Sequence, residues 1–407
     1  MVKRIAAIAF IFFCTAVAWA ILGSTVFMRT FNADNQLKGR VASSWGSPQE
    51  QSPLSAGYQQ STITTATEEE NGVKKIDPHQ TLKWVPLPLE RTRVDVALNV
   101  DYRRKGMLWY STYVVNFAGE YAFRNDTQDQ QSVTCTLHLP AAQAVYDGLA
   151  FSLNDVPVAV QNANGEAFVV FPMKPGESTA VKVAYRSQGQ SSWAYDFGNG
   201  VAEVKDFDLH IRTNFKDFDL PENALSPTSE TRSGNGWDLG WKYDNLLSGY
   251  RIGVDLPQKL QPGPLAGRIS YFAPVSLLFF FFVIFVFATA RGIDLHPMNY
   301  FFMACAFFSF HLLMAYLVDH ISIHLAFVIC SAVSVFLLVS YLRLVVGMKF
   351  AAAEAGIAQF VYLVLFSYAF FFDGYTGLAI TIGAILTLFI VMQTTARVRW
   401  AQKFAAL

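Results

Sequence analysis

The chain has 407 residues, of which 53% are hydrophobic and 15% aromatic, and its 31 basic residues balance 31 acidic residues. A content of 36 phenylalanines exceeds what a soluble chain of this size needs. The balanced charge forms no basic stripe, which argues against a nucleic-acid partner. Composition therefore indicates a membrane protein.

The first predicted element is an apolar helix over residues 5–28, which follows Lys3 and Arg4. The segment Ala18-Trp19-Ala20 fits a small-x-small cleavage site, so a cleaved secretory signal peptide is one interpretation. The apolar run is, however, much longer than the roughly 7 to 15 residues of an ordinary signal-peptide core. We therefore predict that residues 1–28 form an uncleaved transmembrane signal anchor.

Residues 29–75 are predicted to be a flexible linker. The stretch from Asn32 to Gly72 is rich in Ser, Thr, Gln, Gly and Pro and includes the acidic triplet Glu68 to Glu70. Such a composition buries little apolar surface, so it favours a tether or a long loop.

Residues 76–268 are predicted to form a large β-rich domain, because apolar side chains there alternate with polar or small ones. This period of two is clear at Val94, Val96, Leu98 and Val100, at Val115 and Phe117, at Val133, Cys135 and Leu137, at Val181 and Val183, at Phe207, Leu209 and Ile211, and at Trp237, Leu239 and Trp241. Asn154-Asp155 between two such runs predicts a hairpin with a tight turn. Short strands and frequent turns favour an antiparallel sandwich, and the length also fits two subdomains split near residues 162–165. Cys135 is the only cysteine in this segment, which excludes an internal disulfide there.

Five apolar runs follow, each long enough to cross a hydrocarbon core of roughly 30 Å at about 1.5 Å per helical residue. They are Ile269–Ala290, Pro297–Val318, Ile321–Leu342, Ala355–Phe372 and Tyr375–Ala396. We predict a five-helix transmembrane domain over residues 269–400 and a cytoplasmic tail over residues 401–407. The predicted fold is a membrane α-helical bundle of six spans, one plus five, with a large extracytoplasmic all-β, sandwich-like domain.

Topology follows from the positions of Lys and Arg beside the spans. If the N-terminus is cytoplasmic, the inner ends carry Lys3, Arg4, Arg291, Arg343, Lys349, Arg397, Arg399 and Lys403. The short outer turns contain Asp319 and Asp373 without a Lys or Arg. We therefore predict that both termini are cytoplasmic and that residues 29–268 face the periplasm of a Gram-negative cell.

Polar side chains near the outer ends of the spans are the main candidate site, because an ionisable group in lipid is expensive and usually has a function. This polar layer consists of His311, Asp319, His320, His324 and Asp373. As a site it could relay protons or bind a metal through imidazole and carboxylate groups. The alternative is that the acids and His320 are interfacial turn residues and that His311 packs between helices. No HExxH or comparable metal signature is present, so no metal ligand is predicted.

A second cluster of acids, at Asp206, Asp208, Asp217, Asp219 and Glu222, has a spacing that could suit Ca²⁺. Acids that alternate along a solvated strand face explain it more simply. Gly-rich phosphate loops and nucleophile elbows are absent from the sequence. We predict no catalytic residue and no cofactor.

The segment His296-Pro297-Met298-Asn299-Tyr300 begins one span, and Asp319-His320 closes it. Together with Tyr341-Leu342-Arg343, Asp373-Gly374-Tyr375 and a basic tail that ends at Trp400, these segments resemble the CreD family of bacterial inner-membrane proteins. The residues that match the family motif are His296, Pro297, Tyr300 and Trp400. Asp319 stands where the family is expected to have Glu, and His311 where an apolar or aromatic residue is usual.

The resemblance implies one N-terminal span, a large periplasmic β-rich domain and a C-terminal block of spans. It also implies a role in envelope stress and in tolerance of β-lactams and colicin, without an established chemistry. We therefore expect a non-enzymatic envelope protein that contacts the lipid bilayer and binds a periplasmic or membrane protein partner, or a ligand, through its β domain.

Two alternatives remain open. The first is a transporter or intramembrane enzyme that uses His311 and Asp319, which requires a water-filled cavity reaching His311. The second is a structural subunit of an envelope complex, which requires a stoichiometric partner.

Overall fold

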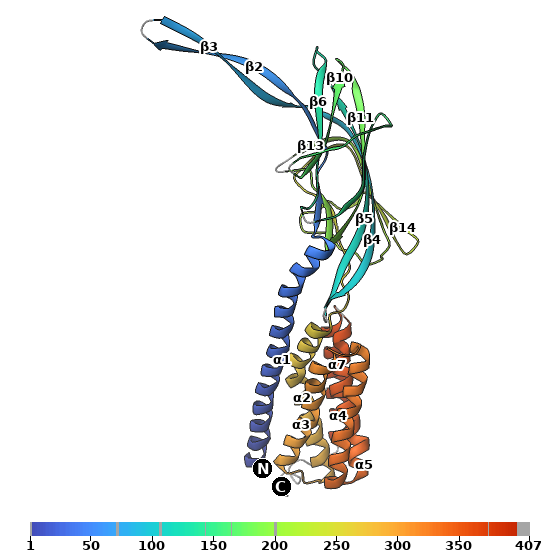
Figure 1. The fold of residues 1–407 in the computed structure, drawn as a ribbon. Helices are drawn as coiled ribbons and strands as arrows, with labels where there is room; N and C mark the ends of the chain where they lie inside the picture. The colour runs from blue at the N-terminus through green and yellow to red at the C-terminus, as the bar shows by residue number, and fades with distance from the viewer. Residues whose placement is uncertain are drawn as a thin grey trace. The chain divides into compact units, whose positions relative to one another are not determined.

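The computed structural model describes residues 2–70, 73–105, 108–142, 144–163, 165–198, 202–372 and 374–396. The chain divides into two compact units (Figure 1). The helical unit combines the start of the chain with the part after residue 259, and the β unit comprises residues 37–105 and 109–259.

Six helices in the described part are long and apolar enough to cross a membrane. They are α1 (Val2–Trp45), α2 (Pro262–Arg291), α3 (Pro297–Leu317), α4 (Ile323–Val346), a helix over Met348–Phe371 and α8 (Thr376–Thr395). The six predicted apolar helices are therefore confirmed. Helix α2 begins earlier than predicted, because Pro262 is suited to the first turn of a helix, where its missing N–H is not needed.

The fifth long helix alternates between α-helical and wider turns. Its segments are α5 (Met348–Phe350), the π-helical η1 (Ala351–Gly356), α6 (Ile357–Gln359), the π-helical η2 (Phe360–Leu365), α7 (Phe366–Tyr368) and the 3₁₀-helical η3 (Ala369–Phe371). π-Helical turns are rare, and they often mark functional positions in helices.

Turn chemistry separates the helices. Gly292 ends α2 in the left-handed conformation, with φ of 70°, and Gly347 ends α4 with φ of 90°. The Ser322 hydroxyl accepts a hydrogen bond from the Leu325 N–H at the start of α4. Each of these residues forms a hydrogen bond with a backbone group that a helix end would otherwise leave unpaired.

The described residues of the β unit form three sheets. The eight-stranded sheet has the order β14 (Ser229–Ser233), β15 (Gly236–Ser248), β13 (Ala202–Thr213), β4 (Leu89–Lys105), β5 (Leu108–Arg124), β11 (Ser178–Gln190), β7 (Tyr146–Leu153) and β8 (Val156–Val158). The five-stranded sheet has the order β3 (Val73–Pro86), β2 (Ser55–Glu70), β6 (Gln131–His138), β10 (Glu166–Met173) and β9 (Gln161–Ala163). The smallest has the order β1 (Gln49–Gln51), β12 (Ser192–Tyr195) and β16 (Ile252–Asp255).

Side chains from all three sheets share one hydrophobic core. Val94 and Phe117 of the eight-stranded sheet, Val133 and Val169 of the five-stranded sheet and Ile252 of the smallest sheet all belong to it. The strands predicted from alternation are confirmed, because the apolar residues that alternate along them are the buried core residues. The β7–β8 hairpin is confirmed as well, with positive φ at Asn154 and Asp155 as a tight two-residue turn requires.

Two boundary predictions are wrong. Residues 29–75 are not a flexible linker, because α1 continues to Trp45 and β1 and β2 follow. Good helix formers such as Leu37, Lys38 and Ala42 extend the helix beyond its apolar part, and the threonines of β2 favour a strand. The split near residues 162–165 is also wrong, since β9 and β10 pair with each other inside one sheet of a single unit.

Candidate functional site

Helix α1 is joined to the start of α3. The Arg4 guanidinium lies 2.7 Å from the Asp294 carboxylate and donates a hydrogen bond to the Leu295 carbonyl oxygen. Both partners directly precede the His296-Pro297 motif. This contact therefore fixes the start of α1 against the start of α3.

A later turn of α1 makes a second ionic contact. Arg29 lies 3.4 Å from the Asp319 carboxylate, donates a 2.6 Å hydrogen bond to the Ala315 carbonyl oxygen and sits 5.4 Å from the centre of the Tyr316 ring. A cation at a helix C-terminus is favourable, because the last carbonyl groups lack intrahelical partners. Asp319 of the predicted polar layer thus has a partner within the helical unit.

Between these two contacts, Trp19 of α1 packs against α3. Its ring meets Phe307, Phe308 and His311 edge to face at centroid distances of 6.1, 5.1 and 5.7 Å, and its side chain is fully buried. Edge-to-face aromatic pairs at these distances are favourable. Helix α1 also approaches α2 closely, where Gly23 faces Tyr271. Small residues allow such close approach of membrane helices.

His311 is enclosed by aromatic side chains. It is 1% exposed, its Nδ1 lies 3.2 Å from the Phe307 carbonyl oxygen, and its ring contacts Trp19, Phe307 and Phe310. Its Nε2 atom lacks a hydrogen-bond partner among the described residues. These contacts favour a packing role for His311 over a water-filled path.

The other members of the polar layer have separate surroundings. His320 and His324 are exposed, and the His324 ring lies 5.3 Å from the Phe371 ring. Asp373 lies outside the described residues. Within the described ranges, no three His, Cys, Asp or Glu side chains gather closely enough to hold a metal ion.

The family motif forms the start of α3. The His296 Nδ1 accepts a hydrogen bond from the Met298 N–H at 3.2 Å, which caps the helix, and Pro297 occupies the first turn. Tyr300 is fully buried against Phe281. Trp400 lies outside the described residues. The described motif residues therefore build a helix start.

Polar side chains also connect the helices inside the bundle. Gln359 of α6 donates to the Ser334 hydroxyl at 2.6 Å, and that hydroxyl donates to the Ala306 carbonyl oxygen at 2.5 Å. Tyr362 of η2 donates to the Thr387 hydroxyl at 2.7 Å. Interhelical hydrogen bonds of this kind hold membrane helices together. Both wide turns of the fifth helix thus lie next to cross-helix contacts.

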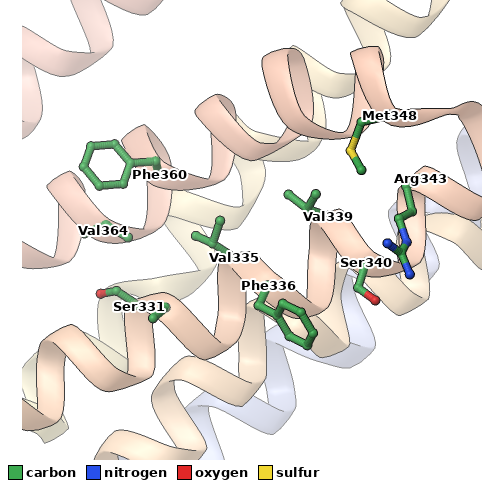
Figure 2. Close-up of a pocket in the computed structure, with 10 residues that line it drawn as sticks. Ser331, Val335, Phe336, Val339, Ser340, Arg343, Met348, Phe360 and Val364 are labelled. Atoms are coloured by element: carbon green, nitrogen blue, oxygen red, sulfur yellow. The ribbon is translucent and has the colours of Figure 1, made fainter.

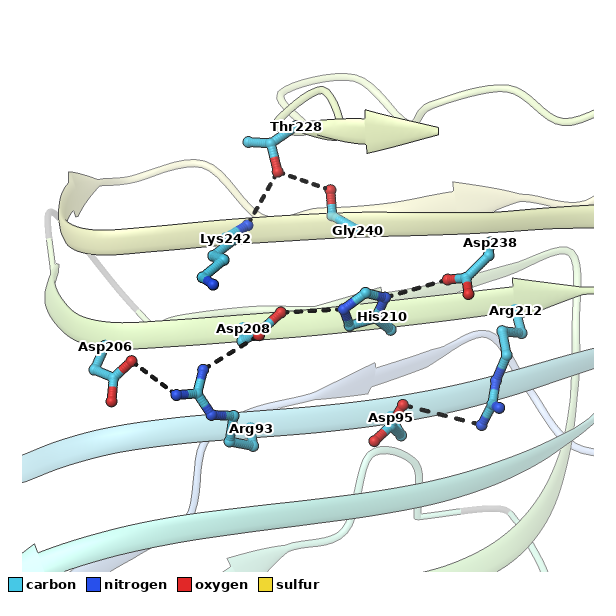
Figure 3. A network of polar contacts seen from close by, with 10 residues as sticks. All are labelled: Arg93, Asp95, Asp206, Asp208, His210, Arg212, Thr228, Asp238, Gly240 and Lys242. Atoms are coloured by element: carbon cyan, nitrogen blue, oxygen red, sulfur yellow. Dashed lines mark hydrogen bonds and ion pairs between the residues drawn. The ribbon is translucent and has the colours of Figure 1, made fainter. Parts of the chain in front are cut away.

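The β unit carries a ladder of ion pairs across β4, β13 and β15 (Figure 3). Arg93 lies 3.0 Å from Asp206 and 3.2 Å from Asp208. The His210 ring nitrogens each lie 3.2 Å from a carboxylate, that of Asp208 or that of Asp238. Two members of the acidic cluster that could have suited Ca²⁺ are thus paired with a neighbouring arginine, as expected for a solvated strand face.

A hollow of about 490 Å³ lies beside this ladder, on the face of β5, β11 and β7. Its floor contains three exposed alanines, Ala118, Ala150 and Ala184, which are direct neighbours across the strands. Its rim includes Arg93, Asp95, Glu120, Asp155 and Lys182. We call this surface the alanine hollow.

The rim charges are organised in pairs. The Lys182 ammonium lies 2.5 Å from Asp155 and 3.6 Å from Glu120, and Arg91 lies 3.1 Å from Glu120. The pKa of Lys182 is raised, chiefly by its hydrogen bond to Asp155. Sequence reasoning missed the hollow, although alanine at outward positions of three strands was its visible signal. Polar residues are usual at such positions.

Long apolar helices and a separate β-rich unit define this chain as a multi-pass membrane protein. The family model described as inner membrane protein CreD matches residues 237–401. This match confirms the resemblance to the CreD family and covers the last strands of the β unit together with helices α2 to α8.

A comparison with curated proteins finds no match. Among solved structures, a Legionella pneumophila protein described as a candidate nutrient-binding protein is 11% identical, with a TM-score of 0.32, over 48% of this chain and 74% of that chain. An M1 zinc metallopeptidase from Deinococcus radiodurans is 12% identical, with a TM-score of 0.26, over 42% of each chain. Likenesses this distant carry no argument about function.

Proposed function

We propose that this chain is an envelope protein of the inner membrane whose β unit lies in the periplasm and binds a protein partner through the alanine hollow. The observation that supports the proposal is the set of three exposed, adjacent alanines with charged residues of both signs around them. Alanine loses no rotamer freedom on docking, and a mixed-charge rim favours one partner and orientation over others.

The proposed role is binding, without catalysis. The rim charges already neutralise one another, at 2.5 Å between Lys182 and Asp155 and at 3.1 Å between Arg91 and Glu120. Paired surface charges suit recognition. A catalytic acid or base must instead be free to donate a proton to its substrate or to accept one from it.

Filling the hollow tests the proposal. In cells that depend on this protein for tolerance of envelope stress, Ala184→Trp in the full chain should abolish the protein's contribution to tolerance while its abundance stays unchanged. Thr231→Trp is the matched control, because Thr231 is exposed on β14 of the same sheet but does not line the hollow. Wild-type tolerance in the Ala184→Trp strain would refute binding at the hollow.

A photo-crosslinking side chain at position 184 tests for the partner directly. We expect one adduct of defined mass in stressed cells, and none from the same side chain at position 231. Equal, diffuse labelling from both positions would show that the hollow has no specific partner.

The polar layer remains a second proposed element. We propose that Asp319, His320 and Asp373 contribute to the same function, so simultaneous alanine substitution should impair stress tolerance without lowering protein abundance. Unchanged tolerance would remove the layer from the mechanism. His311 and His324 are included as candidates, and the aromatic enclosure of His311 argues against the transporter or enzyme alternative.

The periplasmic position of the β unit is supported by the distribution of Lys and Arg at the ends of the spans. A reporter inserted at Gly165, an exposed turn residue with φ of 80°, tests it. We expect a periplasm-dependent reporter to be active there and a cytosol-dependent reporter to be inactive.

The alternative of a structural subunit of an envelope complex predicts instead that a stoichiometric partner is cross-linked in unstressed cells as well as in stressed cells.

A further inference from the structure

A groove of about 500 Å³ lies between α4 and the fifth helix (Figure 2). Its lining is mostly apolar, with Ser331 and Val364 near one end and Arg343 and Met348 near the other, as Figure 2 shows. Phe336 beside it is 69% exposed and Phe360 is 49% exposed. An apolar face this exposed would face lipid in a membrane helix.

Small residues explain why the groove exists. On the α4 side, Ser331, Ala332 and Ser340 leave space between larger neighbours. The facing helix contains the π-helical η1, whose sequence is AAAEAG. Gly356 of η1 lies against α4 so closely that an added β-carbon would be 3.2 Å from Val339. The two helices therefore touch at Gly356 and leave a hollow beside it.

A charged side chain, that of Arg343, lies at one end of the groove. Among the described residues, the Arg343 side chain has no hydrogen-bond or ion-pair partner, and the residue is exposed. Arg291, by contrast, lies 2.6 Å from Glu354. Ser340 is three residues before Arg343, which places both side chains on one face of α4. An arginine fork beside a hydroxyl can hold a phosphate.

We propose that this groove binds an acyl chain of an anionic phospholipid, with the lipid phosphate held by Arg343 and Ser340. From Ser331 to Arg343 the groove follows α4 for about 18 Å, at about 1.5 Å per residue. One leaflet of a hydrocarbon core about 30 Å thick is about 15 Å deep. The groove thus matches the depth of a single leaflet, with the cation at headgroup level. Basic pockets between membrane helices are recognised headgroup sites.

The proposal is tested with the full-length protein in detergent micelles to which phosphatidylglycerol or phosphatidylcholine is added. We expect phosphatidylglycerol to raise the temperature of unfolding at a lower mole fraction than phosphatidylcholine does. Arg343→Gln should raise the required mole fraction of phosphatidylglycerol about tenfold, as expected for loss of a charged hydrogen bond. Ala332→Phe, which fills the groove, should weaken the response to a similar degree.

Two matched variants separate the groove from its surroundings. Lys349→Gln removes a cation at the same end of the helices, and Val333→Phe enlarges an exposed side chain of α4; neither residue lines the groove. Both variants should respond as the wild type does. An unchanged response of Arg343→Gln, or equal responses to the two lipids, would overturn the proposal. A lipid-independent disulfide-linked dimer of Phe336→Cys would also overturn it, by showing that a second copy covers the groove.

Discussion

Arg29 and Asp319, far apart in the sequence, lie 3.4 Å apart and join the first helix to the end of α3. The same guanidinium reaches the Ala315 carbonyl oxygen at 2.6 Å. Arg29 therefore satisfies both a carboxylate and a free carbonyl group at the end of a helix, whereas the Asp319 carboxylate has this one cation as its partner among the described residues.

This asymmetry predicts unequal losses. Arg29→Ala should lower the free energy of unfolding of the full chain by about 1 to 2 kcal/mol, because it removes an ion pair, a hydrogen bond and a cation–ring contact. Asp319→Ala should cost about 0.5 kcal/mol, since both side chains are partly exposed to solvent and the pair is screened. Thermal unfolding in detergent micelles measures both losses.

The control for this pair is Lys38→Ala, which removes an exposed cation farther along α1 and should leave the unfolding temperature unchanged. A double-mutant cycle should give a coupling below about 1 kcal/mol between Arg29 and Asp319. Equal losses for the two single variants would show that the Ala315 contact does not contribute.

Trp19 makes the second prediction. Trp19→Ala should lower the free energy of unfolding by about 3 kcal/mol, because a fully buried aromatic side chain leaves a cavity beside Phe307, Phe308 and His311. Val17→Ala is the matched control on the same helix, since Val17 is 46% exposed. The loss is measured by thermal unfolding of the purified full chain.

The same packing predicts that α1 is retained in the mature protein. Cleavage at Ala18-Trp19-Ala20 would remove Arg4 and Trp19 together with their contacts to the α2–α3 loop and α3. The intact mass of the purified protein should therefore include α1. A mass that begins after Ala20 would contradict this prediction and restore the signal-peptide interpretation.

The six apolar helices and most strands could be predicted, because both depend on local periodicity. The alternation of Val133, Cys135 and Leu137 specified a buried strand face by itself. The extension of α1 to Trp45 and the pairing of β2 with β3 could not be predicted from composition. A polar segment is interpreted as a linker when its own sequence pattern does not indicate the helix or hairpin to which it belongs.

The candidate site was less accessible to sequence reasoning. His311 and Asp319 are close in the sequence, yet one is enclosed by Trp19, Phe307 and Phe310 and the other pairs with Arg29. Those partners come from another helix, so spacing along one helix could not reveal them. The alanine hollow depends likewise on the register that aligns Ala118, Ala150 and Ala184 across strands.

Cys135 gives a further prediction. Burial in the β core raises the pKa of the Cys135 thiol to about 12, and the side chain is fully buried. The reactive thiolate is therefore scarce at neutral pH. With the full chain reconstituted in lipid bilayers, a charged maleimide at pH 7 should leave Cys135 unlabelled until denaturant unfolds the β unit. Cys135→Ala is the control that identifies the labelled site, and rapid labelling of the native protein would contradict burial in a stable core.

Asp255 predicts a dependence of stability on pH. Its pKa is raised, first by partial burial and then by the nearby Asp219 carboxylate, with Arg251 acting in the opposite direction. Because the folded state holds this proton more tightly than the unfolded state does, the contribution to stability is full below the unfolded pKa, about 3.9, and is lost as pH rises through the folded pKa.

The variant Asp255→Asn removes this loss while keeping the shape of the side chain and the backbone pairing with Asp219. It should be more stable than the wild type at pH 7, by less than about 1 kcal/mol because solvent screens a partly exposed carboxylate. The difference should shrink as pH falls toward 4. Asp129→Asn, at an exposed loop position, is the matched control. Unfolding temperatures of the wild type and the variant, measured from pH 4 to pH 8, test this prediction. If the wild type is more stable than Asp255→Asn at pH 7, attraction to Arg251 outweighs burial and repulsion by Asp219.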